Sequence, residues 1–225
     1  MTGAILWSGR SRFDGRPVIL IGTDGSANRK TGPMSQTWIL GQHEPPHNAV
    51  RAGTDGSICG TCVMRAGNGC YVNTAHAPLS VWRAWKRGKY PTMRPATWAA
   101  GRIVRIGAYG DPAAVPVSVW RRMLRGAAGH TGYTHAWRDP RFSGLRDFCM
   151  ASVETDAGAR AAAASGWGTF RVLKPGETVS RLETICPAHG GGTTCADCLA
   201  CDGSGAIVIP GHGSRVSRIP GWGKS

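Results

Sequence analysis

Short apolar runs separated by polar turns recur along the chain. Runs of four to eight aliphatic, β-branched or aromatic residues between turn residues are typical of strands that are covered on both faces. The runs with this pattern span residues 18–22, 37–40, 103–107, 132–136, 148–153, 169–173 and 206–209. The pattern therefore predicts about six or seven strands.

Three segments between these runs carry their apolar residues at helical spacing. In residues 79–87, Trp82 and Trp85 fall on one face, and residues 117–126 and 155–165 are the other two segments. Strands that alternate with helices in this way predict β/α units around a parallel sheet. The expected fold is α/β, a partial (β/α) barrel with a parallel sheet and a C-terminal cysteine-rich metal-binding segment, because the strands are too few for an eightfold barrel.

The composition divides the chain into four predicted segments. They are an irregular basic N-terminal segment (1–35), the partial barrel (36–185) with a cysteine loop (59–70), a metal-binding cysteine segment with the last strand (186–212) and a flexible basic tail (213–225). No apolar run approaches the roughly 20 residues of a membrane span, and the apolar stretch near the N-terminus is shorter than a signal peptide. We expect a cytoplasmic protein with no membrane partner.

Seven of the eight cysteines fall into two clusters with metal-ligand spacing. The clusters are Cys59-x2-Cys62-x7-Cys70 and Cys186-x8-Cys195-x2-Cys198-x2-Cys201. In a chain with no secretion signal, such spacing indicates a metal or iron–sulfur centre rather than disulfides.

Each cluster leaves the choice of metal open. Three thiolates in the first, glycine-rich loop can hold a [4Fe–4S] cluster with one iron open to a ligand. They can equally supply three zinc ligands, with Cys149 or His76 as the fourth, although Cys149 also suits a small core position. Four thiolates in the second cluster can close a structural zinc site or hold an auxiliary iron–sulfur cluster.

Polar residues follow several predicted strands and are expected at one rim of the sheet, where function collects in such folds. These residues are Asp111, His135, Ser152, Glu154, Arg171 and Cys186. Asp111 is either a catalytic group or only the cap of the following helix. His135 is a candidate acid, base or ligand, or a residue satisfied by a neighbour. Arg171 can bind a carboxylate or phosphate of a ligand, or form a structural ion pair.

The net charge of +14 and the isoelectric point near 10.1 point to a polyanionic partner. A charge of this size acts over a Debye length of about 8–10 Å. Nucleic acid or a nucleotide is the leading candidate, and a solubilising surface is the alternative. The loop at residues 28–32 lacks the full phosphate-binding pattern of nucleoside triphosphatases.

The order of these motifs resembles the radical S-adenosylmethionine superfamily. A cysteine loop precedes a strand that ends in Tyr109-Gly110-Asp111, and a later strand ends in Ser152-Val-Glu154. The resemblance implies a [4Fe–4S] cluster on the first three cysteines and S-adenosylmethionine against these two strand ends. The chain departs from the usual C-x3-C-x2-C loop, has Tyr71 after its last cysteine, and has Asp111 where the family has Glu.

Most of residues 25–212 is also similar to small bacteriophage proteins that share the cysteine loop, the Gly-Asp-Pro turn and a cysteine-rich C-terminal part. The favoured expectation is a radical enzyme that modifies a nucleic acid or nucleotide, acting in the host cytoplasm if a phage encodes it. One alternative is a zinc-stabilised base-exchange enzyme that resembles guanine transglycosylases, with Asp111 as nucleophile or base. The other is a non-catalytic, metal-stabilised module that binds DNA or RNA.

Overall fold

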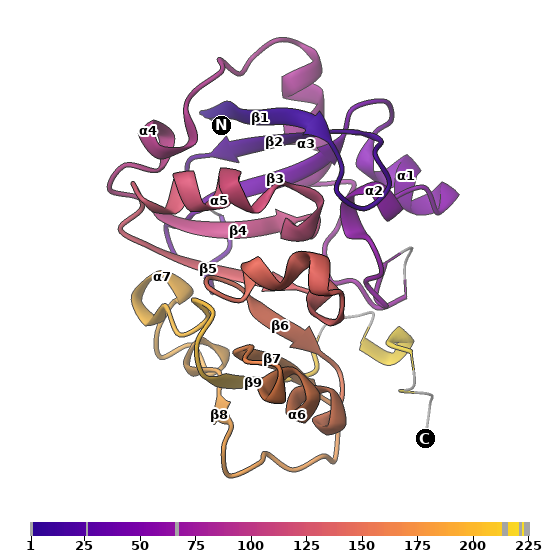
Figure 1. Cartoon of the computed structure of the whole chain (residues 1–225), viewed down its shortest axis with the longest axis vertical. Helices are drawn as coiled ribbons and strands as arrows, with labels where there is room; N and C mark the ends of the chain where they lie inside the picture. The colour runs from indigo at the N-terminus through magenta and orange to yellow at the C-terminus, as the bar shows by residue number, and fades with distance from the viewer. Residues whose placement is uncertain (1, 26, 66–67, 213–215, 221, 223–225) are drawn as a thin grey trace.

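A computed structural model describes residues 2–25, 27–65, 68–212, 216–220 and 222. Within them one twisted sheet runs through the molecule, with the strand order β1-β2-β3-β4-β5-β6-β7-β9-β8 (Figure 1). The nine strands of this sheet are β1 (Gly3–Arg10), β2 (Pro17–Thr23), β3 (Ser35–Gly41), β4 (Ile103–Tyr109), β5 (Gly129–Thr134), β6 (Met150–Val153), β7 (Thr169–Leu173), β8 (Thr184–Ile185) and β9 (Ala206–Pro210).

Two kinds of strand pairing build the sheet. β1, β2 and β3 pair antiparallel, whereas every pairing from β3 to β8 is parallel. The prediction of an α/β fold is confirmed, and the predicted parallel sheet is found from β3 onward, with an antiparallel part at β1 to β3 that was not predicted. The seven apolar runs correspond to β2 to β7 and β9. β2, β3 and β6 are buried along nearly their whole length, which gives a strong local signal.

The prediction that residues 1–35 are irregular is wrong for the part that the structure describes. Gly3–Arg10 forms the edge strand β1, which pairs along the length of β2. Glycine and serine disfavour strands, and the register shifts between Ile5 and Trp7, so the local pattern is weak. Pairing with the buried strand β2 supplies the stability that the local sequence lacks.

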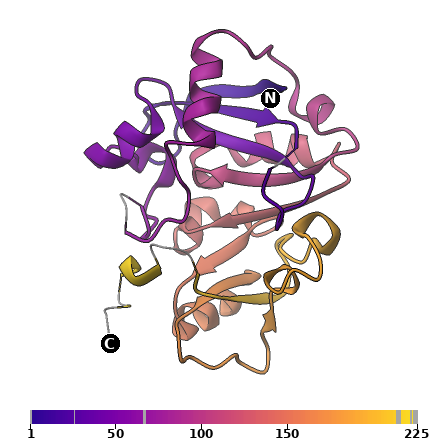
Figure 2. The same ribbon diagram turned by 180° about the vertical axis from the view of Figure 1, so that it is seen from behind.

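Helices cover both faces of the sheet. α5 lies across one face near β4, and α3 lies across the other face near β3 (Figure 1 and Figure 2). The three predicted helices correspond to α3, α5 and α6. The helices are α1 (Pro46–Ala52), α2 (Gly56–Cys59), α3 (Ala77–Lys86), α4 (Pro95–Ala99), α5 (Val117–Leu124), α6 (Asp156–Ala164) and α7 (Cys195–Cys198).

The helix α6 begins where the sequence places its cap. The hydroxyl of Thr155 accepts a hydrogen bond from the backbone N–H of Gly158 over 3.0 Å, which satisfies one of the free N–H groups of the first turn. No helix in the described residues has both the length and the apolar character that a bilayer span requires.

The two cysteine clusters lie at opposite ends of the parallel strands (Figure 1 and Figure 2). The first follows α2, beside the carboxyl ends of β3 and β4. The second includes α7, whose Cys195 N–H donates to the carbonyl of Lys30 in the loop that leads into β3. The backbone N–H of Gly132 in β5 donates to the carbonyl of Cys201. The sheet therefore separates the two groups of thiols.

The prediction of a flexible tail at residues 213–225 is wrong for its described residues. A 3-10 helix spans Val216–Arg218, and Ile219 and Trp222 are buried. They pack with Met64 of the cysteine loop. Residues 213–215, 221 and 223–225 lie outside the described residues.

Candidate metal centre and adjoining cavity

The cysteine loop is joined directly to the Gly-Asp-Pro turn that follows β4. The backbone N–H of Asp111 donates to the carbonyl oxygen of Ile58 over 2.6 Å, one residue before Cys59. Gly110 has a φ of +84°, and a Cβ there would lie 2.7 Å from the Cβ of Ile39. Only glycine fits this turn, because any side chain would push β3 and the loop apart.

Three thiols gather beside this turn. Burial raises the pKa of Cys59 well above its ordinary value, and the charges of Asp55, Cys62, Cys70 and Asp111 raise it further. Cys62 and Cys70 also pack against one apolar cluster, with Met64, Ile219 and Trp222. The loop is fixed by the ion pair of Arg65 with the buried Asp55 at 3.0 Å.

Tyr109, predicted as a cofactor contact, ends β4 next to the Gly-Asp-Pro turn. Its ring is buried, and its hydroxyl has no hydrogen-bond partner among the described residues. Burial raises the pKa of this hydroxyl, and the charges of Cys59, Asp55 and Cys70 add to the effect. A buried hydroxyl without a partner is costly, so this one marks a place where a bound group would satisfy it.

Asp111 is fully engaged as a positioning residue. Its Oδ1 accepts from the backbone N–H of Ala113 at 2.9 Å and from the hydroxyl of Thr134 at 2.7 Å, and its Oδ2 accepts from the backbone N–H of His135 at 2.8 Å. The carboxyl caps the following 3-10 helix (Pro112–Ala114), as the sequence suggested, and also ties β4 to the end of β5. Burial raises its pKa despite these hydrogen bonds.

His135 and Glu154 form a pair at the ends of β5 and β6. The Nε2 of His135 lies 3.3 Å from Oε1 of Glu154, and both side chains are largely buried. Burial alone would lower the pKa of His135. Its contacts with Cys62 and Glu154, together with the charges of Cys62 and Asp111, outweigh burial and raise the pKa well above its ordinary value.

A cavity of about 380 Å³ opens beside this pair. Thr61 and Val63 of the cysteine loop line one side, and His135, Ser152 and Glu154 line another. The structure thus brings together three predicted rim residues and the first cysteine cluster. Asp111 does not line this cavity.

The remaining walls of the cavity come from residues that no sequence pattern singles out as site residues. Phe13 and Phe142 pack edge to face with ring centroids 5.3 Å apart, and Arg138 and Arg141 add guanidinium groups. Phe13 lies in the turn between β1 and β2, far from the cysteines in sequence. Only the folded arrangement reveals it.

Arg171 does not join the cavity. Its guanidinium pairs with Glu183 at 2.6 Å and with Glu177 at 3.0 Å, and its side chain is 1% exposed. Of the two roles considered for Arg171, the geometry favours the structural ion pair.

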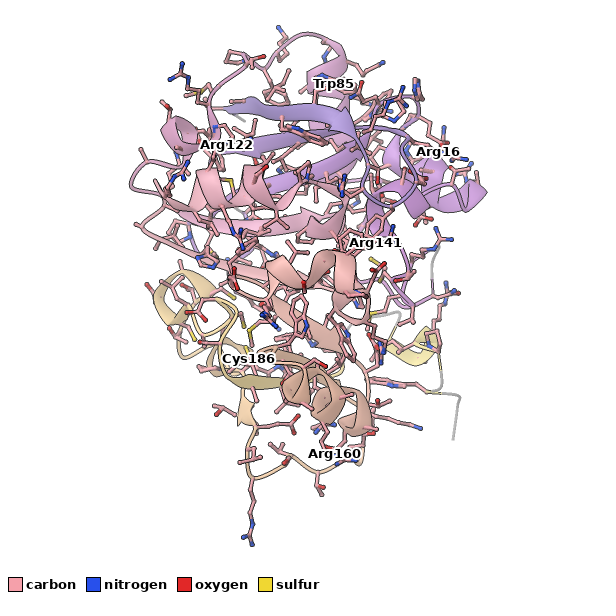
Figure 3. The ribbon with its side chains drawn as sticks, viewed as in Figure 1. Arg16, Trp85, Arg122, Arg141, Arg160 and Cys186 are labelled. Atoms are coloured by element: carbon pink, nitrogen blue, oxygen red, sulfur yellow. The ribbon has the colours of Figure 1, made fainter. Side chains whose placement is uncertain are left out.

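Cys186 is not at the rim with His135, so that prediction is wrong. β8 has only two residues, which pair with Ile207 and Val208, and Cys186 therefore stays beside the first half of β9. Figure 3 shows Cys186 well apart from Arg141.

The second cysteine cluster surrounds a small cavity of about 20 Å³. Its four cysteines line it together with Tyr133 of β5. Burial raises the pKa of Cys201 to about 12, and the charges of the other three thiols contribute. The cysteines of this cluster, Cys186, Cys195, Cys198 and Cys201, are thus brought together by the fold.

Within the described residues no disulfide joins the cysteines of either cluster, and the eighth cysteine, Cys149, is buried apart from them. In the described parts of the chain, no three His, Cys, Asp or Glu side chains converge as the ligands of a single metal ion do. His76, considered as a ligand, is exposed at the start of α3.

Comparison with known proteins adds no relative. No family model matches the chain, and neither a curated protein nor a solved structure matches it.

Proposed function

We propose that this chain is a radical enzyme that binds a [4Fe–4S] cluster and S-adenosylmethionine and acts on a nucleotide or nucleic acid. The observation that carries the proposal is the hydrogen-bonded contact between the three-thiol loop and the Gly-Asp-Pro turn. The same loop also forms a wall of the 380 Å³ cavity. The parallel strands from β3 to β9 fit a partial (β/α) barrel, whose ligands gather at the carboxyl edge.

The donor set of the first cluster fits an iron–sulfur group. Thiolates that bind different irons of one cluster need not converge on one point. The high pKa of Cys59 means that a bound cation must displace its proton, so loading should release protons. The hydroxyl of Tyr109, which has no partner in the described structure, would gain a hydrogen bond from a group held there.

When bound, the cluster supplies the electron that starts hydrogen abstraction through S-adenosylmethionine. The chain itself would position the bound groups and shield them from water. Asp111 fixes the relative placement of the cysteine loop and the end of β5 through its hydrogen bonds with Ile58, Thr134 and His135. His135 and Glu154 can hold or move a proton at the cavity wall, and Ser152, which lines the same cavity, would offer a hydroxyl to a cofactor held there.

The four cysteines around α7 are proposed as a second metal centre, either zinc or iron–sulfur. Their support is the closeness of four thiols that no disulfide uses. A centre there would join three parts of the chain, which are the loop before β3, the strand β5 and the strand β9. The backbone N–H of Cys195 already donates to that loop, and the carbonyl of Cys201 already accepts from β5. Its role would be to stabilise this end of the sheet.

The geometry gives no support to base exchange with Asp111 as nucleophile. Both carboxylate oxygens of Asp111 are occupied by donors, and the group does not line the cavity. A non-catalytic nucleic-acid-binding module remains the alternative, since a net charge of +14 supports it equally.

Elemental analysis and a cleavage assay on the anaerobically purified full chain test the proposal. We expect about four irons with matching sulfide at the first cluster. We also expect cleavage of S-adenosylmethionine when dithionite is added. Cys62→Ala should lose both, whereas Cys149→Ala, which alters a buried cysteine outside the clusters, should keep both. Protein that carries zinc without iron and cleaves no cofactor would contradict the proposal.

A further inference from the structure

In the described part of the chain, two of the basic side chains around the cavity lie against carboxylates, and a third does not. Arg141 pairs with Asp139 at 2.6 Å, and His135 lies 3.3 Å from Glu154. Arg138 also lines the cavity, but among the described residues it forms no ion pair with a carboxylate. Arg138 therefore presents to the cavity a guanidinium that no described carboxylate pairs with.

The guanidinium of Arg138 is held in place by an aromatic ring. Its Cζ lies 3.9 Å from the centroid of the Trp137 ring, and Trp137 is buried. A cation–π contact of this kind fixes the plane of the guanidinium and leaves the N–H groups at its edge available. The side chain is exposed at the cavity, so a ligand can reach those donors.

We propose that Arg138 binds the phosphate of a nucleotide whose base occupies the cavity. A guanidinium fork matches the geometry of a phosphate and can donate two parallel hydrogen bonds to it. The edge-to-face pair of Phe13 and Phe142 gives the cavity an apolar wall suited to a base. The volume of about 380 Å³ falls in the range of small-molecule sites.

This inference rests on the proposed function for the class of substrate, but it concerns binding alone. The carboxylate of S-adenosylmethionine is a second source of an oxyanion at the same guanidinium. The nucleotide and S-adenosylmethionine can be added to the protein separately, so titration with each shows which of the two oxyanions Arg138 binds.

Isothermal titration of the full chain with three probes tests the inference. The probes are the deoxynucleoside 5′-monophosphates, the corresponding nucleosides and S-adenosylmethionine. We expect the monophosphates to bind more tightly than the nucleosides, and Arg138→Gln to weaken only the monophosphates, by about tenfold or more. Arg138→Lys should recover part of this affinity, because it keeps the charge and loses the fork.

Arg122→Gln is the matched control, because it removes the same charge from an exposed position on α5 away from Arg141 and the cavity (Figure 3). It should leave all affinities unchanged. Equal losses in both variants would mean diffuse attraction by the net charge and would overturn the inference. So would equal affinity for nucleosides and monophosphates, or a loss confined to S-adenosylmethionine. Iron content and cofactor cleavage are measured separately, so failure here leaves the proposed function standing.

Discussion

Ile219 packs directly against the backbone of Gly69, so closely that a Cβ at Gly69 would lie 2.7 Å from the Cγ1 of Ile219. Trp222 is buried in the same apolar cluster. The loop side chains in that cluster are Met64, Cys62 and Cys70. The described residues of the C-terminal segment therefore cover part of the first cysteine cluster and shield it from solvent.

Replacing Gly69 with alanine should loosen this cover. Gly69 has a φ of +105°, which side chains rarely adopt, and the added Cβ would also displace Ile219. We expect a loss of about 1–3 kcal/mol in the free energy of unfolding, measured by urea denaturation. We also expect faster oxidation of the thiols, measured by their reaction with a thiol reagent.

Gly41→Ala serves as the control for this change. An added Cβ at Gly41 meets no atom within 4 Å. Its effect on stability and thiol reactivity should be small. If Gly69→Ala behaved like Gly41→Ala, the C-terminal segment would not be a cover of the loop.

The contact between Ile219 and Gly69 illustrates what the sequence does not predict. Thr169–Leu173 was predicted at its observed bounds, because β-branched and aromatic residues between turn residues specify a strand locally. The C-terminal segment is rich in glycine, serine, arginine and proline, a composition that is typical of loose tails. Its two buried residues gain their stability from the distant cysteine loop, and no local pattern records that contact.

Some residues of the candidate site were likewise predicted from the sequence, and others were not. Cysteine spacing alone predicted both groups of thiols, and strand ends predicted His135 and Glu154. The position of Phe13 at the cavity, and the lack of a carboxylate partner for Arg138 among the described residues, depend on which loops meet there. The spacing of residues along the chain does not show which loops meet. The position of Cys186 was missed because β8 is too short to carry it to the rim.

Tyr109→Phe should have different effects on the metal-free and on the metal-loaded protein. The mutation removes a buried hydroxyl that has no partner among the described residues, so the metal-free chain should gain about 1–2 kcal/mol of stability. In the loaded chain the same change would remove a hydrogen bond to the bound group. We expect a shifted visible spectrum or reduction potential there. Unchanged spectra, or a loss of stability in the metal-free chain, would show that this hydroxyl has no such role.

Asp111→Asn should destabilise the fold around the cysteine loop. An amide offers one acceptor oxygen and turns an N–H group toward a donor, so at least one of the three hydrogen bonds to the carboxylate is lost. We expect a cost of about 1–3 kcal/mol in urea denaturation of the metal-free chain.

A double-mutant cycle with Thr134→Val tests whether this cost arises from the contact seen here. The hydroxyl of Thr134 donates to Asp111 over 2.7 Å, so the two changes should couple by about 0.5–3 kcal/mol. Asp147→Asn, which alters an exposed carboxylate paired with Arg121, should cost less than about 1 kcal/mol. Purely additive effects of Asp111→Asn and Thr134→Val would argue against a positioning role for Asp111.

The buried pair of Arg171 and Glu183 should make stability depend on acid pH. Two hydrogen bonds of 2.7 and 2.6 Å join them, and the hydrogen bond from Arg171 lowers the pKa of Glu183 below its ordinary value of 4.5. A lowered folded-state pKa means that the pair stabilises the fold fully above about pH 4.5. This stabilisation is lost as the pH falls through the lower folded-state value.

Glu183→Gln should therefore cost about 3 kcal/mol at pH 7, because it leaves the buried guanidinium of Arg171 with the more exposed Glu177 as its remaining acidic partner among the described residues. The variant should also lose less stability than the wild type as the pH is lowered below 4.5, since the titrating group is gone. Glu177→Gln, at a side chain that is 37% exposed, should cost about 1 kcal/mol or less. Urea denaturation at a series of pH values measures all three. Parallel pH profiles of wild type and Glu183→Gln would mean that this carboxylate gains nothing from Arg171, and that a ligand-binding role for Arg171 should be considered again.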